Sequence, residues 1–145
     1  MIKYRKIFLD ANVVFDLFDK KTTEINRNNA KLILQQVMEN NYIGYISPVS
    51  FLLTNYFIIK QNSSEKEALK KIQALENIIK ITTINQQIVK KALYSHLHDF
   101  EDALQYYSAE AESVDLIISR DAHDFYKIKL PVLSPSEFLQ NIYPN

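Results

Sequence analysis

Residues 6–18 read KIFLDANVVFDLF. The first four residues are a short, β-favouring run that ends at Asp10, and from Val13 to Phe18 the apolar residues follow a helical order. The segment therefore predicts a strand that passes directly into a helix, with an aspartate at the junction. A strand followed by a helix is the repeating unit of α/β proteins.

The rest of the chain continues this alternation. Further strands are expected at 42–47, 78–84, 115–119 and 131–133, because these are short runs of mainly apolar residues. Helices are expected at 24–39, from a cap at Ser50 to Ile59, at 65–76, after a cap at Asn85, at 99–112, and from the Ser134 capping box to Ile142. No repeat or linker divides the pattern, so residues 1–145 are predicted to form one α/β domain with a mostly parallel sheet.

The composition excludes several classes of function. Of 145 residues, 47% are hydrophobic, and 17 Lys and Arg balance 17 Asp and Glu, so the chain has no net positive field for polyanions. The single glycine, Gly44, cannot build a dinucleotide-binding fingerprint or a phosphate-binding P-loop. The absence of cysteine excludes thiolate metal sites and favours a cytoplasmic location. No signal peptide or membrane span is expected, since no apolar stretch approaches the roughly 20 residues that a span needs.

Aspartates follow two of the predicted strands. Ligands of open α/β sheets bind beyond the carboxyl ends of the strands, where Asp10 and Asp121 are expected. An aspartate after a strand can also cap the next helix, so position alone leaves both interpretations open. Asp16, by contrast, is assigned to the exposed surface of the first helix.

The helix at 99–112 supplies a third acid. With Phe100 at the centre of its buried face, a rotation of about 100° per residue places Asp99 and Asp102 on one flank. Asp102 is then expected to border the sheet end, and Glu101 is expected to point elsewhere.

Converging carboxylates raise one another's pKa values unless a cation neutralises them. An all-oxygen set of Asp10, Asp102 and Asp121 suits Mg²⁺ or Mn²⁺, which keep several waters and bridge to substrate phosphates. Such ions activate water for phosphoester cleavage. The three aspartates are therefore candidate metal ligands and catalytic residues.

Three segments together resemble PIN-domain proteins, a ribonuclease fold found in many prokaryotic toxins of toxin–antitoxin pairs. They read IFLDANVVFDLF at 7–18, HDFEDALQYYSA at 98–109 and VDLIISRDAHDFYKIKLPVLSPSEFL at 114–139. The resemblance implies a three-layer α/β/α sandwich with a mostly parallel central sheet. It also implies an acidic cluster that binds Mg²⁺ or Mn²⁺, cleavage of single-stranded RNA, and an antitoxin that holds the enzyme in check.

The resemblance carries over to particular residues. Asp10, Asp102 and Asp121 match the family's first, third and fourth acids. Asn12 stands where such proteins often have a polar residue beside the first acid, and Ser119 takes the usual Thr or Ser place near the last acid. Both are implied to support the site.

One family acid is missing. The second acid is usually a glutamate early in the helix after the second strand, but residues 46–60 hold no carboxylate, and one of residues 53–55 takes its place. The loss removes a negative charge and predicts weak metal binding. Asp99 and Asp124 are candidates to compensate for it.

Two functions remain open at this point: a metal-dependent endoribonuclease, and a catalytically impaired PIN module that binds RNA or a protein. A receiver-like phosphoacceptor fits poorly, because the predicted strand at 78–84 ends without an aspartate. A haloacid-dehalogenase-type phosphatase would need an aspartate where Asn12 stands. The apolar content of residues 49–59 further predicts a homodimer, a higher oligomer or an antitoxin-like partner.

Overall fold

Five strands form the central sheet. In the computed structural model, which describes residues 4–144, they are β1 (Lys6–Leu9), β2 (Ile43–Ile46), β3 (Lys80–Ile81), β4 (Leu116–Ile118) and β5 (Val132–Leu133). They lie in the order β3-β2-β1-β4-β5, and every neighbouring pair is parallel. All carboxyl ends therefore meet at one edge of the sheet, as the sequence predicts.

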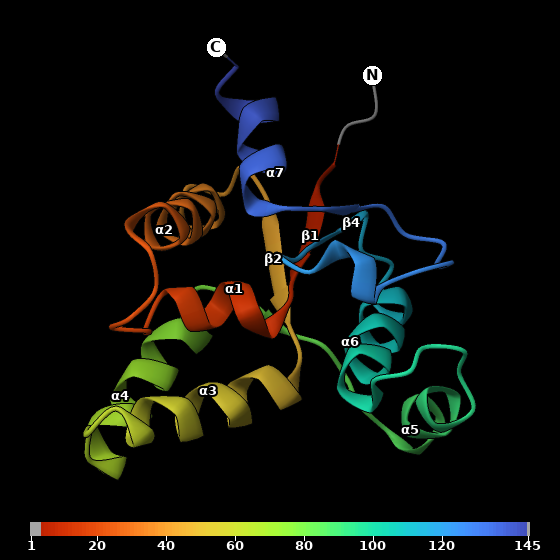
Figure 1. Ribbon diagram of the computed structural model, residues 1–145, viewed down its shortest axis with the longest axis horizontal. Coiled ribbons are helices and arrows are strands. Elements are labelled where there is room, and N and C mark those ends of the chain that lie inside the picture. Colours follow the sequence, from red (N-terminus) through yellow and green to blue (C-terminus); the bar gives the residue numbers. More distant parts are fainter. Residues whose placement is uncertain (1–3, 145) are drawn as a thin grey trace.

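Helices cover both faces of this sheet (Figure 1). They are α1 (Ala11–Asp16), α2 (Glu24–Met38), α3 (Pro48–Lys60), α4 (Glu65–Glu76), α5 (Gln86–Leu93), α6 (Phe100–Ala111), α7 (Pro135–Ile142) and the 3₁₀ helix η1 (Ala122–Asp124). Ile7 and Leu9 pack in one cluster with α1, α2 and α7, whereas Phe8 packs in a second cluster with α5 and α6. Neighbouring residues of a strand point to opposite faces, so the two clusters lie on opposite sides of the sheet. The predicted α/β/α sandwich is confirmed.

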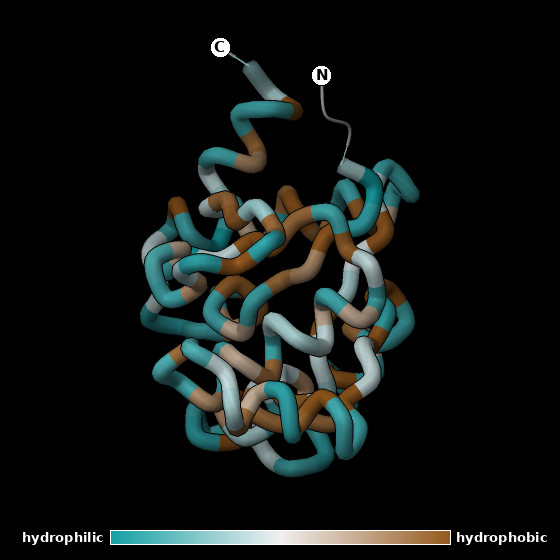
Figure 2. The backbone as a smooth tube through the Cα atoms, turned by 90° about the vertical axis from the view of Figure 1, so that its right-hand side faces the viewer, coloured by the Kyte–Doolittle hydropathy of each residue, from teal (hydrophilic) through white to brown (hydrophobic). Residues whose placement is uncertain are grey.

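The strands run through the hydrophobic interior. All three residues of β4 are fully buried, as expected for a central parallel strand covered on both faces. Figure 2 shows hydrophobic segments within the molecule and many hydrophilic segments on its outside. The expectation of a single domain over residues 1–145 stays a prediction.

The start of α3 differs from the prediction of a cap at Ser50. The helix begins one turn earlier, because Ser47 caps it by accepting from the backbone N of Ser50 at 3.2 Å. Pro48 occupies the first turn, where its missing N–H costs nothing. The predicted caps at Asn85 and Ser134 are confirmed.

The strand predicted at 78–84 is also much shorter than expected, with only Lys80 and Ile81 in β3. β3 is the edge strand and pairs with β2 alone. The backbone N of Thr82 still donates to the carbonyl of Ile46 at 2.9 Å, but β2 ends there because Ser47 begins the cap of α3. A strand cannot extend beyond its only partner.

Candidate acidic site

The carboxyl ends of β1 and β4 lie side by side at the topological switch point of the sheet. β2 and β3 lie on one side of β1, and the chain then crosses to place β4 on the other side of β1. Asp10 directly follows β1, and its backbone N donates to Ile118 O, at the end of β4, at 3.0 Å. Asp121 follows β4 after two further residues. Ligand sites of open α/β sheets lie at such points, so both aspartates occupy the predicted place.

Asn12 and Ser119 connect the two aspartates. The side-chain N of Asn12 lies 3.2 Å from the Oδ2 atoms of both Asp10 and Asp121, and equally far from Ser119 Oγ. Ser119 Oγ donates to Asp10 Oδ2 at 2.7 Å and accepts from the backbone N of Asp121 at 3.0 Å. The four side chains therefore form one hydrogen-bonded group.

Asp10 is both a helix cap and the most buried acid of this group. Its Oδ1 accepts from the backbone N of Ala11 at 2.8 Å at the start of α1, and the residue is only 5% exposed. Burial raises the pKa of Asp10 above its usual value, and the charges of Asp121 and Asp124 raise it further. The hydrogen bonds from Ser119 and Ala11 act in the opposite direction without cancelling the rise.

Asp102 lies in the first turn of α6, within electrostatic reach of Asp10. Burial raises the pKa of Asp102 from 3.8 to about 7, helped by the charges of Asp10, Asp99, Asp124 and Glu101. Asp99 is the N-cap of α6 and accepts from the backbone N of Asp102 at 3.0 Å.

Asp124 lies in η1, and its Oδ1 is 3.4 Å from Nε2 of His123. Its charge raises the pKa of both Asp10 and Asp102. Asp124 thus lies within electrostatic reach of both Asp10 and Asp102, Asp121 within reach of Asp10, and Asp99 within reach of Asp102.

The prediction that Glu101 points away from the site is wrong. Burial raises the pKa of Glu101, and the charge of Asp10 is the next largest cause. The error lies in the choice of Phe100 as the centre of the buried face, because Phe100 is 46% exposed. Gln105, which is fully buried and lies one helical turn after Glu101, was the better signal for the face that Glu101 shares.

Neutral side chains join α3 to α6, near where the family resemblance would place a glutamate. Gln105 of α6 accepts from Ser47 Oγ through its side-chain oxygen and donates to Ser50 Oγ at 2.8 Å. One turn further along α3, Thr54 is fully buried, and its hydroxyl has no hydrogen-bond partner. Glu101 lies one turn before Gln105 and therefore on the same side of α6, the side that contacts α3. α6 thus has a carboxylate on the side where α3 lacks the family glutamate.

The assignment of Asp16 to the helix surface is also wrong. Asp16 is 1% exposed, and its Oδ2 lies 2.8 Å from Nε of Arg120, the residue between Ser119 and Asp121. Within residues 4–144 this is the only ion pair that joins a Lys or Arg to an Asp or Glu. Its partners are 104 positions apart, so the chain offered no local signal for it.

The donor set fits a hydrated divalent cation. Among residues 4–144, no three Asp, Glu or His side chains lie close enough to hold one ion together. Asp10 and Asp121, however, both contact the Asn12 amide, and no lysine or arginine pairs with either carboxylate in the described part of the chain. Mg²⁺ usually keeps several waters and binds through one or two carboxylates, so this smaller set is sufficient.

Comparison with known proteins agrees with this architecture. Residues 6–123 match a family described as PIN domain. The chain belongs to the PIN-domain family. Ribonuclease VapC1 of Aquifex aeolicus (strain VF5) is 30% identical over 140 residues, which cover 93% of this chain and 94% of that PIN-domain relative. The resemblance noted from the three sequence segments is therefore confirmed.

Solved structures show the same PIN fold. A toxin–antitoxin complex from Klebsiella pneumoniae superposes with a TM-score of 0.65 and 19% identity, covering 89% of this chain and 97% of that one. VapBC2 from Rickettsia felis, bound to a DNA fragment from its promoter, gives a TM-score of 0.61 and 14% identity, covering 89% and 98%.

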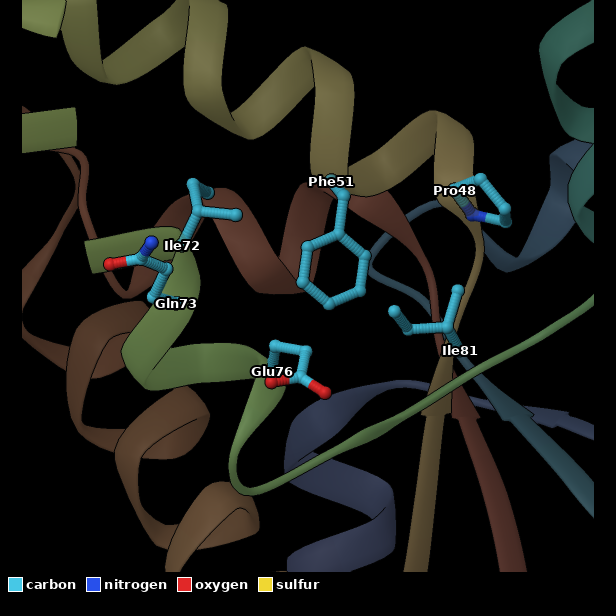
Figure 3. Close-up of a pocket in the computed structure, with 6 residues that line it drawn as sticks. All are labelled: Pro48, Phe51, Ile72, Gln73, Glu76 and Ile81. Carbon is cyan, nitrogen blue, oxygen red and sulfur yellow. The ribbon is translucent and has the colours of Figure 1, made fainter. Parts of the chain in front are cut away.

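A separate apolar hollow lies between α3, α4 and β3. It has a volume of about 360 Å³ and is lined by Pro48, Phe51, Ile72, Gln73, Glu76 and Ile81. The Phe51 ring projects from α3 into this space (Figure 3). None of the acids described above lines it. Within residues 4–144, no helix is both long and apolar enough to span a membrane.

Proposed function

We propose that the protein is a metal-dependent endoribonuclease that cleaves phosphodiesters of single-stranded RNA and acts as a toxin. One observation carries the proposal: Asp10 and Asp121 meet at the Asn12 amide at the switch point of the sheet, Asp102 lies within electrostatic reach of Asp10, and within residues 4–144 none of the three pairs with a Lys or Arg. Ionised carboxylates that are buried without a basic partner cost free energy unless a cation binds them. The ribonuclease that is 30% identical supports the choice of RNA as substrate.

Asp10 and Asp121 would bind Mg²⁺ or Mn²⁺ directly, and Asp102 would contact the ion through one of its waters. When bound, the ion supplies an activated water and stabilises charge on the phosphate. The hydrogen bonds of Asn12 and Ser119 fix the orientation of the Asp10 carboxylate.

Glu101 and two further aspartates add negative charge to the site. We propose Glu101 as the residue that compensates for the missing glutamate of α3, because it lies on α6 within the field of Asp10. Asp99 and Asp124 support the site through their charges on Asp102. These roles predict that the ion is bound through few direct protein contacts and therefore weakly.

The alternative is a PIN module that binds RNA or a protein without cleaving. It is favoured by the neutral contacts of Gln105 with Ser47 and Ser50, which occupy the junction of α3 and α6 without a carboxylate. A cleavage time course on several unstructured RNAs decides between the two. We expect cleavage with millimolar Mn²⁺ and none with EDTA; inactivity on every RNA with Mn²⁺ would favour the binding module.

We also propose a protein partner for the surface of α3, either an antitoxin or a second copy of the chain. Leu52 and Tyr56 lie one helical turn apart on α3 and are 70% and 58% exposed. Exposed apolar residues grouped on one face often mark interfaces. A reducing cytoplasm, which the absence of cysteine favours, is the proposed location.

Replacing both Leu52 and Tyr56 by Asp is expected to abolish self-association, because each change would bury a charge in the contact. Sedimentation of wild type and variant over a range of concentrations measures this. Leu93→Asp is the matched control, since Leu93 is 61% exposed but lies on α5. A wild type that stays monomeric at high concentration would contradict the homodimer and leave the antitoxin as the proposed partner.

A further inference from the structure

The backbone of Arg120 forms part of the acidic site. It lies between Ser119 and Asp121, and its backbone N donates to Oδ1 of Asn12 at 3.2 Å. Asn12 also contacts both Asp10 and Asp121 through its side-chain N. The position of the Arg120 main chain is therefore coupled to the position of both aspartates.

The side chain of Arg120 is held from one side. Its Nε lies 2.8 Å from Oδ2 of buried Asp16, on α1. The other oxygen of Asp16 accepts from the hydroxyl of Thr22 at 2.7 Å, so both oxygens of the carboxylate have a partner. A buried aspartate at this place costs free energy unless it is paired, which makes the ion pair a defined anchor for Arg120.

The anchor leaves the outer part of the guanidinium accessible. A guanidinium has five N–H donors, and the contact with Asp16 uses the Nε end. Among residues 4–144, no group other than Asp16 is in a hydrogen bond or ion pair with the Arg120 guanidinium, and its side chain is 38% exposed. The exposed N–H donors of the guanidinium therefore remain for a ligand next to the acidic site.

RNA that approaches this site meets an excess of negative charge. Asp10 and Asp121 share the Asn12 amide, and Asp102 and Glu101 lie within electrostatic reach of Asp10, while the chain as a whole is neutral. Favourable contact with a phosphate thus requires a local cation besides any metal ion. A planar guanidinium suits this role, because two of its N–H groups match two phosphate oxygens.

We propose that Arg120 is a substrate-binding residue whose guanidinium, held by Asp16, donates to a backbone phosphate of the RNA at the edge of the acidic site. The inference rests on the proposed function, since it assumes RNA as the ligand. A purely structural role would require only that Arg120 neutralise Asp16.

The substrate-binding and structural roles of Arg120 can be distinguished by measuring RNA binding in a variant that does not cleave the RNA. The background is Asp10→Asn, and the probe is a short fluorescein-labelled oligouridylate, titrated at fixed Mg²⁺ over a series of KCl concentrations. Arg120→Gln should weaken binding about tenfold, the value of one charge-assisted hydrogen-bonded contact. The slope of log affinity against log salt should fall by about 0.7, which corresponds to one phosphate of a single strand.

Two further variants control for stability and charge. Arg120→Gln leaves Asp16 buried without its partner and should lower the melting temperature, whereas the double variant with Asp16→Asn should melt close to the background and still bind RNA about tenfold more weakly. Arg5→Gln removes an arginine whose Nη1 donates to the carbonyls of Asn40 and Asn41, beyond the amino end of β1, and should leave RNA binding unchanged.

The outcomes are distinct. Background affinity and salt slope in the double variant would overturn the inference and leave Arg120 a structural partner of Asp16. An equal loss in Arg5→Gln would overturn it too, because any surface charge would then suffice. No RNA binding by the background protein would also overturn it, while the cleavage assay on wild type decides the proposed nuclease activity independently.

Discussion

Asp10→Asn is expected to abolish Mn²⁺-dependent cleavage of single-stranded RNA, with a rate loss of at least about 100-fold. The amide keeps the size of the side chain but removes the charge that would hold the ion, and a bound ion contributes several kcal/mol of transition-state stabilisation. Cleavage time courses of wild type and variant, purified in parallel, measure the loss. Equal rates in both would indicate a contaminating nuclease.

The same variant should fold normally. An asparagine oxygen can still accept from the backbone N of Ala11, so the cap of α1 is kept. The substitution also removes a carboxylate whose pKa is raised by burial, so the free energy of unfolding should not fall. Melting curves check this, with Asp19→Asn, the same chemical change in the loop after α1, as the control for activity and stability.

The sequence was sufficient for the parts of the site that depend on local patterns. Asp10 directly follows an apolar run and Asp121 follows another by a few residues, so both were predicted to lie after strands. Parallel strands bring their carboxyl ends to one edge of the sheet. Both interpretations of Asp10 that position left open proved compatible, because one oxygen caps α1 while the other joins the group of Asn12 and Ser119.

Features that depend on distant partners were not predictable in this way. The burial of Asp16 is explained only by Arg120, and the uncharged junction of α3 and α6 rests on Gln105, 58 positions from Ser47. Glu101 was misplaced because a large apolar side chain was taken to mark the helix face in contact with the core. Phe100 is half-exposed, whereas Gln105, one helical turn after Glu101, is fully buried and marks the face that Glu101 shares.

Protons and metal ions are expected to compete at Asp102, because its pKa is about 7 in the metal-free protein. An ion binds the carboxylate and not the carboxylic acid, so the Mn²⁺ concentration for half-maximal binding should rise about tenfold for each pH unit below 7. Above pH 7 it should change little. Calorimetric titration of wild type at several pH values measures this, and we expect half-saturation at millimolar concentration even at pH 8 because of the missing glutamate.

Stability without metal should change with pH in the opposite sense to the usual behaviour of aspartates. The folded protein holds the proton of Asp102 up to about pH 7, whereas the unfolded chain loses it near 3.8. Between these values the native state binds more protons, so this carboxyl group lowers the free energy of unfolding as pH rises from about 4 to about 7. Added Mn²⁺ should therefore raise the melting temperature more at pH 8 than at pH 5.

The variant Asp102→Asn tests whether the pH dependence comes from Asp102 and not from Asp10 or Glu101, whose pKa values are also raised. The variant should lose part of the stability decrease between pH 4 and 7, and its Mn²⁺ affinity should be weaker and less dependent on pH. Asp19→Asn should reproduce the wild-type profile in both measurements. If Asp102→Asn kept the full pH dependence of metal binding, the competing proton would belong to another carboxylate and Asp102 would not take part in binding the ion. The reason is that a neutral amide has no proton for the ion to displace.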